Sequence, residues 1–120
     1  MKSITLVNPR NHTIIQAQLA DTFFTKLRGL MFRKEIHPNS GLILSENSES
    51  ILNTSIHMLF MNFDISAIWI NKDWLIVDKR LAKKWRLAYI PSVPALHVLE
   101  LHASQIENFS IGDKLEIQID

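Results

Sequence analysis

The clearest structural pattern in this chain is found at residues 65–77, which read ISAIWINKDWLIV. Two apolar runs flank the polar triplet Asn71-Lys72-Asp73, and this spacing predicts a β-hairpin with a three-residue loop. Trp69 and Trp74 lie on either side of the loop. Because they are five residues apart, they need not share a face of the hairpin. One can therefore cover the core while the other is exposed.

Further strands are predicted on both sides of this hairpin. Residues 13–19 alternate between apolar and polar side chains, as a half-buried strand does. Residues 56–61, IHMLFM, are apolar on both faces and predict a strand that is covered on both sides. The remaining predicted strands are residues 3–7, 42–44, 96–101 and 114–119. So many short strands predict a mainly β fold, either an antiparallel β-sandwich or a partly closed barrel.

One short helix is predicted in the N-terminal third of the chain. Asp21 or Thr22 can cap its N-terminus, and residues 23, 27 and 30 form one apolar stripe. Gly29 is placed to end the helix in the left-handed conformation. A single helical turn is also predicted at residues 104–108.

The composition limits the class of protein. With 120 residues and 47% apolar residues, the chain is expected to form a single domain over residues 1–120. Thirteen basic and twelve acidic residues give a net charge of +1, which argues against a bulk polyelectrolyte binder. The lack of cysteine excludes disulfides, thiolate metal sites and cysteine nucleophiles. No signal peptide or membrane-spanning run is recognised, so we expect a cytoplasmic protein without a membrane partner.

Four short motifs occur in a fixed order along the chain. They are Arg28-Gly29-Leu30-Met31-Phe32-Arg33, residues 55–61 (SIHMLFM), residues 98–101 (VLEL) and residues 111–113 (IGD). Taken together they resemble domain-of-unknown-function family 192, a set of small uncharacterised bacterial and archaeal proteins, over residues 15–120. The resemblance implies a jelly-roll-like β-sandwich with a helix early in the chain. It implies no activity.

The chain departs from this family at one position. Where the family has Phe-Pro-Ile-Asp after the second motif, this chain reads Phe63-Asp64-Ile65-Ser66. Ser66 therefore stands at the position of the family's aspartate, and Asp64 is found two residues earlier. The resemblance leaves open whether Asp64 takes the place of that acid.

Arg28, Arg33 and His57 are the candidate binding residues within these motifs. Arginine forks bind carboxylates or phosphates, so the two arginines can form an anion clamp; alternatively, their stems cover the rim of the core. His57 lies among apolar residues, where it can act as a base or bind a ligand. The alternative is a core histidine that is hydrogen-bonded to a backbone carbonyl. A neighbouring carboxylate, Asp64 or Glu100, would strengthen a chemical role.

Metal and cofactor chemistry has little support in the sequence. No nucleophile elbow, phosphate-binding glycine loop or nucleotide fingerprint occurs, so we predict no cofactor and assign no catalytic residue. We also predict no metal site, because the histidines lack the spacing that would place two of them on one face of a strand or helix. They are His12, His37, His57, His97 and His102.

A basic cluster lies at residues 79–86, KRLAKKWR, which contain five of the thirteen basic residues and Trp85. Basic residues interleaved with aromatic ones can bind single-stranded nucleic acid. Lysines at an exposed strand end also keep a protein soluble and prevent edge pairing. The second interpretation needs no partner, so we do not expect nucleic acid to be the main ligand.

The sequence therefore predicts a non-enzymatic module that binds a small ligand or a protein partner. The predicted ligand-binding residues are Arg28, Arg33, His57, Asp64 and Trp69. One alternative is a small enzyme that uses His57 as a general base on an anionic substrate. A second is weak nucleic-acid binding through residues 79–86. The identity of the ligand and the oligomeric state stay open.

Overall fold

The computed structural model describes residues 2–119, and it has a seven-stranded sheet with two short helices. This confirms the predicted mainly β fold. The elements in chain order are β1 (Ser3–Asn8), β2 (Thr13–Ala20), α1 (Phe23–Arg28), β3 (Ser40–Ser50), β4 (Ile65–Ile70), β5 (Ile76–Ala82), β6 (Ala95–His102), the 3-10 helix η1 (Ala103–Asn108) and β7 (Glu116–Ile119).

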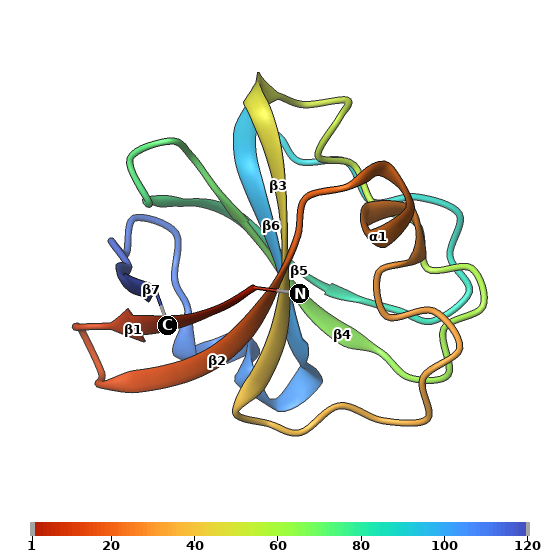
Figure 1. The fold of residues 1–120 in the computed structure, drawn as a ribbon, viewed down its shortest axis with the longest axis horizontal. Coiled ribbons are helices and arrows are strands. Elements are labelled where there is room, and N and C mark those ends of the chain that lie inside the picture. The colour runs from red at the N-terminus through yellow and green to blue at the C-terminus, as the bar shows by residue number, and fades with distance from the viewer. Residues whose placement is uncertain (1, 120) are drawn as a thin grey trace.

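The strands form one sheet in the order β5-β4-β6-β3-β2-β1-β7. Neighbouring strands are antiparallel except β2 and β3, which are parallel. Parallel neighbours need a crossover connection. Residues 21–39, which include α1, supply it, so the helix lies over one face of the sheet (Figure 1).

The two edges of the sheet approach each other at one end. An isolated bridge joins Leu75 to Lys114, just before β5 and β7, and the Ile76 amide donates to the Asp113 carbonyl at 2.9 Å. Beyond these contacts β5 and β7 do not pair, so the sheet is partly closed and does not form a barrel.

Apolar side chains form a core on each face of the sheet. The helix-side core contains Trp69 and residues of β3 and β6, and it is covered by the segments that include Leu30, Met58 and Met61. The opposite core lies between β1, β2, β4 and β6 and contains the buried Phe109. All six residues of β4 are buried. The predicted hairpin at residues 65–77 forms as β4 and β5, but its connection is residues 71–75 and not the predicted three-residue loop, because Trp74 has a φ of +63° and lies outside β5.

The predicted strand at residues 56–61 is wrong. This segment is a covering loop, whose one ladder contact is the isolated bridge between Ile56 and Tyr89. Phe60 has a φ of +61°, which an extended strand does not allow. Ile56, Met58 and Met61 are buried because the loop packs them onto the sheet. A loop that covers a core needs apolar residues much as a strand does, and the sequence pattern did not separate the two.

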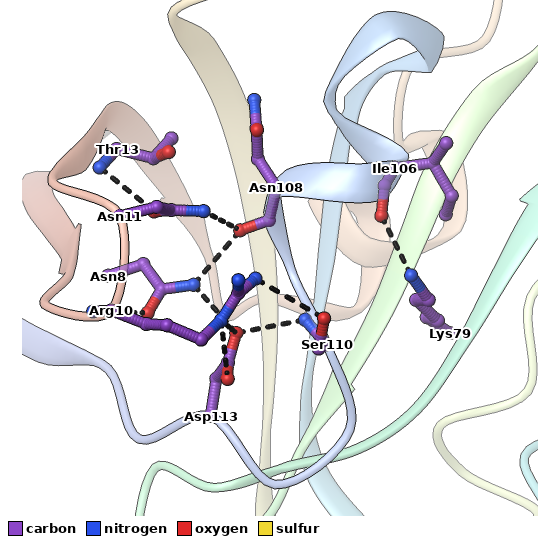
Figure 2. A network of polar contacts seen from close by, with 9 residues as sticks. All are labelled: Asn8, Arg10, Asn11, Thr13, Lys79, Ile106, Asn108, Ser110 and Asp113. Carbon is purple, nitrogen blue, oxygen red and sulfur yellow. Dashed lines mark hydrogen bonds and ion pairs between the residues drawn. The ribbon is translucent and has the colours of Figure 1, made fainter.

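A polar network ties the β1–β2 hairpin to the segment between η1 and β7 (Figure 2). The side-chain amide of Asn8 donates to the Asn108 carbonyl at 2.9 Å and to the Asp113 carboxylate at 2.8 Å. Arg10 Nε lies 3.0 Å from the same carboxylate. Burial opposes ionisation of Asp113, but hydrogen bonds from Asn8, Ser110 and Arg10 outweigh it and lower the pKa of Asp113. The network therefore fixes the seam where the sheet edges meet.

Candidate functional site

A cavity of about 300 Å³ lies on the helix side of the sheet. One wall is α1 and the turn that follows it, residues 26–31, and a second wall is the loop at residues 53–57 together with Met61. The sheet closes the cavity with Leu44 and Glu46 of β3 and Val98 and Glu100 of β6. Apolar walls around a few polar groups are typical of small-molecule sites.

The end of α1 is shaped by a glycine turn. Thr22 and Thr25 form a capping box that starts the helix, and Gly29 ends it at φ +49° and ψ −128°. The Met31 amide donates to the Arg28 carbonyl at 2.9 Å, which makes a turn of type II′ geometry with Gly29 at its second position. Gly29 ends the helix with a positive φ, as predicted, but its ψ of −128° differs from the left-handed conformation that the sequence predicted. Because Leu30 is buried in the core, the turn is anchored against the sheet.

Glu100 contributes the buried carboxyl group of the cavity. The residue is 5% exposed and lies in the middle of β6, between Leu42 of β3 and Ala67 of β4. No hydrogen bond or ion pair joins its carboxyl group to any residue that the structure describes, and the carboxyl oxygens are open to the cavity instead. Burial raises the pKa of Glu100 to about 7, although the charge of Arg33 acts in the other direction. This carboxyl group therefore gains or loses a proton near neutral pH.

The two predicted arginines have different positions. Arg28 is exposed, lines the cavity and forms no ion pair within residues 2–119. Arg33 is partly buried and lies outside this cavity, beside a smaller hollow next to Gln16 and Gln18, yet its charge acts on Glu100. The rim also carries Lys26, which is already paired with Glu46 at 2.7 Å. Arg28 is thus the cation at the cavity that stays available to an anion.

His57 lines the same cavity, but both of its ring nitrogens have backbone partners. Nε2 lies 3.2 Å from the Leu27 carbonyl, and Nδ1 accepts the Leu59 amide at 3.3 Å. These contacts assign a neutral ring with its proton on Nε2. The side chain therefore connects the end of α1 to the covering loop through backbone contacts, but it is only partly buried and is not a residue of the core.

Asp64 and Trp69 lie outside the lining of the cavity. Asp64 accepts the Lys84 amide at 2.9 Å and faces the Lys83 ammonium at 3.5 Å; the backbone hydrogen bond is the main cause that lowers the pKa of Asp64. Trp69 is fully buried, and its indole donates to the Thr54 carbonyl at 2.7 Å. Trp69 thus holds the loop at residues 53–57, which forms one wall of the cavity. Asp64 holds residues 83–84, which follow β5.

Ser66 and Asp64 occupy different environments. Ser66 is fully buried and donates to the His102 and Ala103 carbonyls at 3.0 and 3.2 Å, where β6 runs into η1. Asp64 is half-buried and interacts with the segment at residues 83–84 instead. The two side chains share no partner, so Asp64 does not take over the contacts made at position 66.

From the sequence, Glu100 is predicted only as a possible carboxylate partner of His57. A charged residue inside the apolar run Val98-Leu99-Glu100-Leu101 is itself a signal of a buried functional group, because glutamate is rarely buried. No group of three or more histidine or acidic side chains that could hold a metal is found in residues 2–119. Within the same range, no helix has the length and apolar character needed to cross a bilayer.

Comparison with known proteins gives uncharacterised relatives. A UPF0127 protein of Thermococcus kodakarensis is 42% identical over 85 residues, 71% of this chain and 52% of the relative. A UPF0127 protein of Pyrococcus furiosus is 38% identical over 104 residues, 85% of this chain and 86% of the relative. The chain thus spans about half the length of the first relative and most of the second.

Two crystal structures have the same fold. A candidate transcription regulator of Sinorhizobium meliloti superposes with a TM-score of 0.80 at 19% identity, over 96% of this chain and 92% of that protein. A protein of unknown function from Novosphingobium aromaticivorans gives 0.80 at 22% identity, over 95% and 83%. The model of family DUF192, described as "Uncharacterized ACR", matches residues 5–118, and the chain therefore belongs to this family.

Proposed function

We propose that this protein is a non-enzymatic module that binds a small ligand in the cavity between α1, residues 53–57 and the sheet. The observation that carries the proposal is the carboxyl group of Glu100, which faces this cavity, is almost fully buried and has no polar partner among the described residues. No fully buried side-chain oxygen of the described residues lacks a hydrogen-bond partner, so the carboxyl oxygens of Glu100 are open to the cavity. A ligand that enters the cavity can therefore donate a hydrogen bond to Glu100.

The chemistry of the walls narrows the class of ligand. An amine or hydroxyl group would face Glu100, and a short apolar body would pack against side chains such as Met31, Met61 and Val98. A cavity of about 150 Å³ holds one benzene molecule. The 300 Å³ available here suits a molecule about twice that size. Arg28, at the same cavity, would accept an anionic group at the other end of the ligand.

The enzyme alternative that relies on His57 has less support. A general base needs a free lone pair within reach of the substrate. Nδ1 of His57 already accepts the Leu59 amide, and Nε2 faces the Leu27 carbonyl. The contacts of His57 are those of a residue that holds two segments together.

The proposal can be tested by following backbone amide NMR signals during titration with n-butylamine, n-butanol and n-butyrate at pH 8, where Glu100 is mostly ionised. We expect saturable shifts around the cavity with the amine, and binding of butyrate weaker by about tenfold or more. Glu100→Gln should lose the preference for the amine. Glu107→Gln is the matched control, since Glu107 is exposed on η1. Equal binding of amine and butyrate, or unchanged binding by Glu100→Gln, would refute the proposal.

A further inference from the structure

Three exposed aromatic side chains form a cluster on the outside of the molecule. The ring centroids of Phe32 and Phe60 are 5.3 Å apart in a stacked arrangement, and those of Phe60 and Trp85 are 5.2 Å apart in an edge-on arrangement. Phe32 is 63% exposed, Phe60 46% and Trp85 55%. We call these three residues the aromatic cluster. Large apolar side chains that gather on a surface in this way mark an interaction site.

The backbone of the aromatic cluster is in an unusual conformation. Phe32, Phe60 and Trp85 have φ values of +67°, +61° and +69°. Bulky residues rarely adopt positive φ, and such strain gathers at functional sites. Each of the three lies in a turn and keeps its side chain exposed, although burial of the rings would favour folding. The chain therefore keeps these rings exposed against both steric strain and the hydrophobic effect.

Backbone hydrogen bonds hold the aromatic cluster in place. The Phe32 amide donates to the Phe60 carbonyl at 3.0 Å, and the Trp85 amide donates to the Met58 carbonyl at 2.7 Å. The Met58 amide in turn donates to the Arg86 carbonyl at 2.9 Å. Three separate segments are thus fixed relative to one another. A partner that binds here would meet preorganised rings and lose little conformational entropy on the protein side.

The charges around the aromatic cluster are mostly positive. Lys83, Lys84 and Arg86 flank Trp85, and residues 79–99 contain no acidic residue. Lys83 faces Asp64, whereas the side chains of Lys84 and Arg86 form no ion pair within the described part of the chain. Leu87, which follows, is 77% exposed. The surface therefore combines apolar anchors with an excess of positive charge over the single carboxylate of Asp64.

We propose that the aromatic cluster is the docking site for an acidic segment of a partner protein, which packs an apolar side chain onto the rings and directs its carboxylates to Lys84 and Arg86. Tryptophan and arginine are the residues that dominate protein interfaces. Nucleic acid fits less well, because the stacked rings already occupy part of each other's faces, because the cations are few, and because Leu87 adds apolar surface. The inference is independent of the cavity, since none of these residues lines it.

Selection from a random peptide library displayed on phage tests the proposal without a known partner. We expect enriched peptides to combine Asp or Glu with Phe, Leu or Trp. A synthetic copy of an enriched peptide should bind Trp85→Gly more weakly by about tenfold or more in fluorescence anisotropy. Glycine tolerates positive φ, so this variant removes the ring and relieves the backbone at the same position. A Lys84→Glu/Arg86→Glu variant should weaken binding similarly, and Ile111→Ala, also at an exposed residue, should leave it unchanged.

Several results would overturn the proposal. One is the absence of peptides enriched on this protein relative to Trp85→Gly, and another is an enriched set that lacks acidic residues. Fluorescein-labelled oligo(dT) and vesicles of phosphatidylglycerol serve as the other two probes. If either binds in a manner that Trp85→Gly abolishes, while the acidic peptides do not bind, the surface recognises nucleic acid or a lipid bilayer instead.

Discussion

The Glu100 carboxyl group lies beside the space that a side chain on Gly29 would occupy, although the two residues are far apart in sequence. A Cβ atom placed on Gly29 would lie 3.1 Å from Oε1 and 3.8 Å from Oε2 of Glu100. The glycine thus has two functions. It provides the positive φ that ends α1, and it leaves space for the carboxyl group beside the backbone.

We expect Gly29→Ala to lower the free energy of unfolding by about 1–3 kcal/mol because of backbone strain at φ +49°. It should also displace the Glu100 carboxyl group and weaken butylamine binding. Gly112→Ala is the matched control, since its φ is +97° but nothing lies within 4 Å of the added Cβ. Urea unfolding and the amine titration would measure both effects. If Gly112→Ala lost amine binding to the same degree, the contact between Gly29 and Glu100 would not be its cause.

Glu100 should make stability fall as the pH rises. The pKa is about 7 in the folded protein against 4.5 for an ordinary glutamate, so the folded state binds more protons between these values. Its contribution is therefore complete below pH 4.5 and is lost as the pH rises through 7, with a total of about 3 kcal/mol. In the natural protein this fall is expected above pH 6.5, and Glu100→Gln should remove it in urea unfolding measured from pH 6.5 to 8. The same slope in Glu100→Gln would contradict the assignment.

His97 should act in the opposite direction. Its ring is buried, stacks on Trp74 at 4.2 Å between centroids and contacts Ser45 Oγ at 2.7 Å. Burial lowers the pKa of His97 from 6.5 to about 4, so the unfolded state binds more protons in this range. Stability from this group is complete above pH 6.5 and is lost as the pH falls toward 4, by about 3 kcal/mol.

The two groups thus compensate each other between pH 4.5 and 6.5 in the natural protein. Glu100→Gln should reveal stability that rises with pH, and His97→Gln stability that falls with pH. The variant that carries both substitutions is the control, and its stability should depend least on pH over this interval. Two single variants with slopes of the same sign would rule out this pairing.

Asp113→Asn should destabilise the seam at the edges of the sheet. The folded pKa of Asp113 is lowered, so its contribution is present above pH 3.8 and is lost as the pH falls below that value. We expect a loss of about 1.5–3 kcal/mol at pH 7, as for hydrogen bonds to a charged group, and less sensitivity to acid. Asp73→Asn, at an exposed position in the β4–β5 loop, is the control for urea unfolding. Equal losses in both variants would argue against the network.

His57→Ala should loosen the end of α1. The substitution removes the contact with the Leu27 carbonyl and the acceptor for the Leu59 amide. We expect a loss of about 1–2 kcal/mol and faster hydrogen exchange in residues 23–31. Unchanged exchange rates in α1 would contradict this structural role of His57.

The sequence predicted those elements whose pattern is local. The hairpin at residues 65–77 follows from period-two alternation around Asn71-Lys72-Asp73, and α1 follows from its cap and from Gly29. The prediction of a strand at residues 56–61 was wrong because a loop that is buried on one side has the same apolar content as a strand. The parallel pairing of β2 with β3 was also missed, since the crossover through α1 has no local signature.

The candidate site was predicted only in part, for a physical reason. Arg28 and His57 do line one cavity, as the motifs indicated, whereas Asp64 and Trp69 lie elsewhere and Arg33 reaches the site only through its charge. Glu100 is placed in the cavity wall by its pairing with Leu42 of β3 and Ala67 of β4, two strands that are far from β6 in sequence. The register between strands cannot be predicted from the sequence of one strand alone. The ligand-binding role of the five predicted residues stays a prediction.

The seam between Leu75 and Lys114 has a consequence for how copies of this chain behave toward one another. An open sheet offers unpaired amides and carbonyls on its outermost strands, and these recruit strands from other molecules into aggregates. Here the outermost strands, β5 and β7, are drawn together at one end, and β5 carries the exposed Arg80. Partial closure thus opposes edge-to-edge association between molecules, and we expect loss of the seam to promote aggregation.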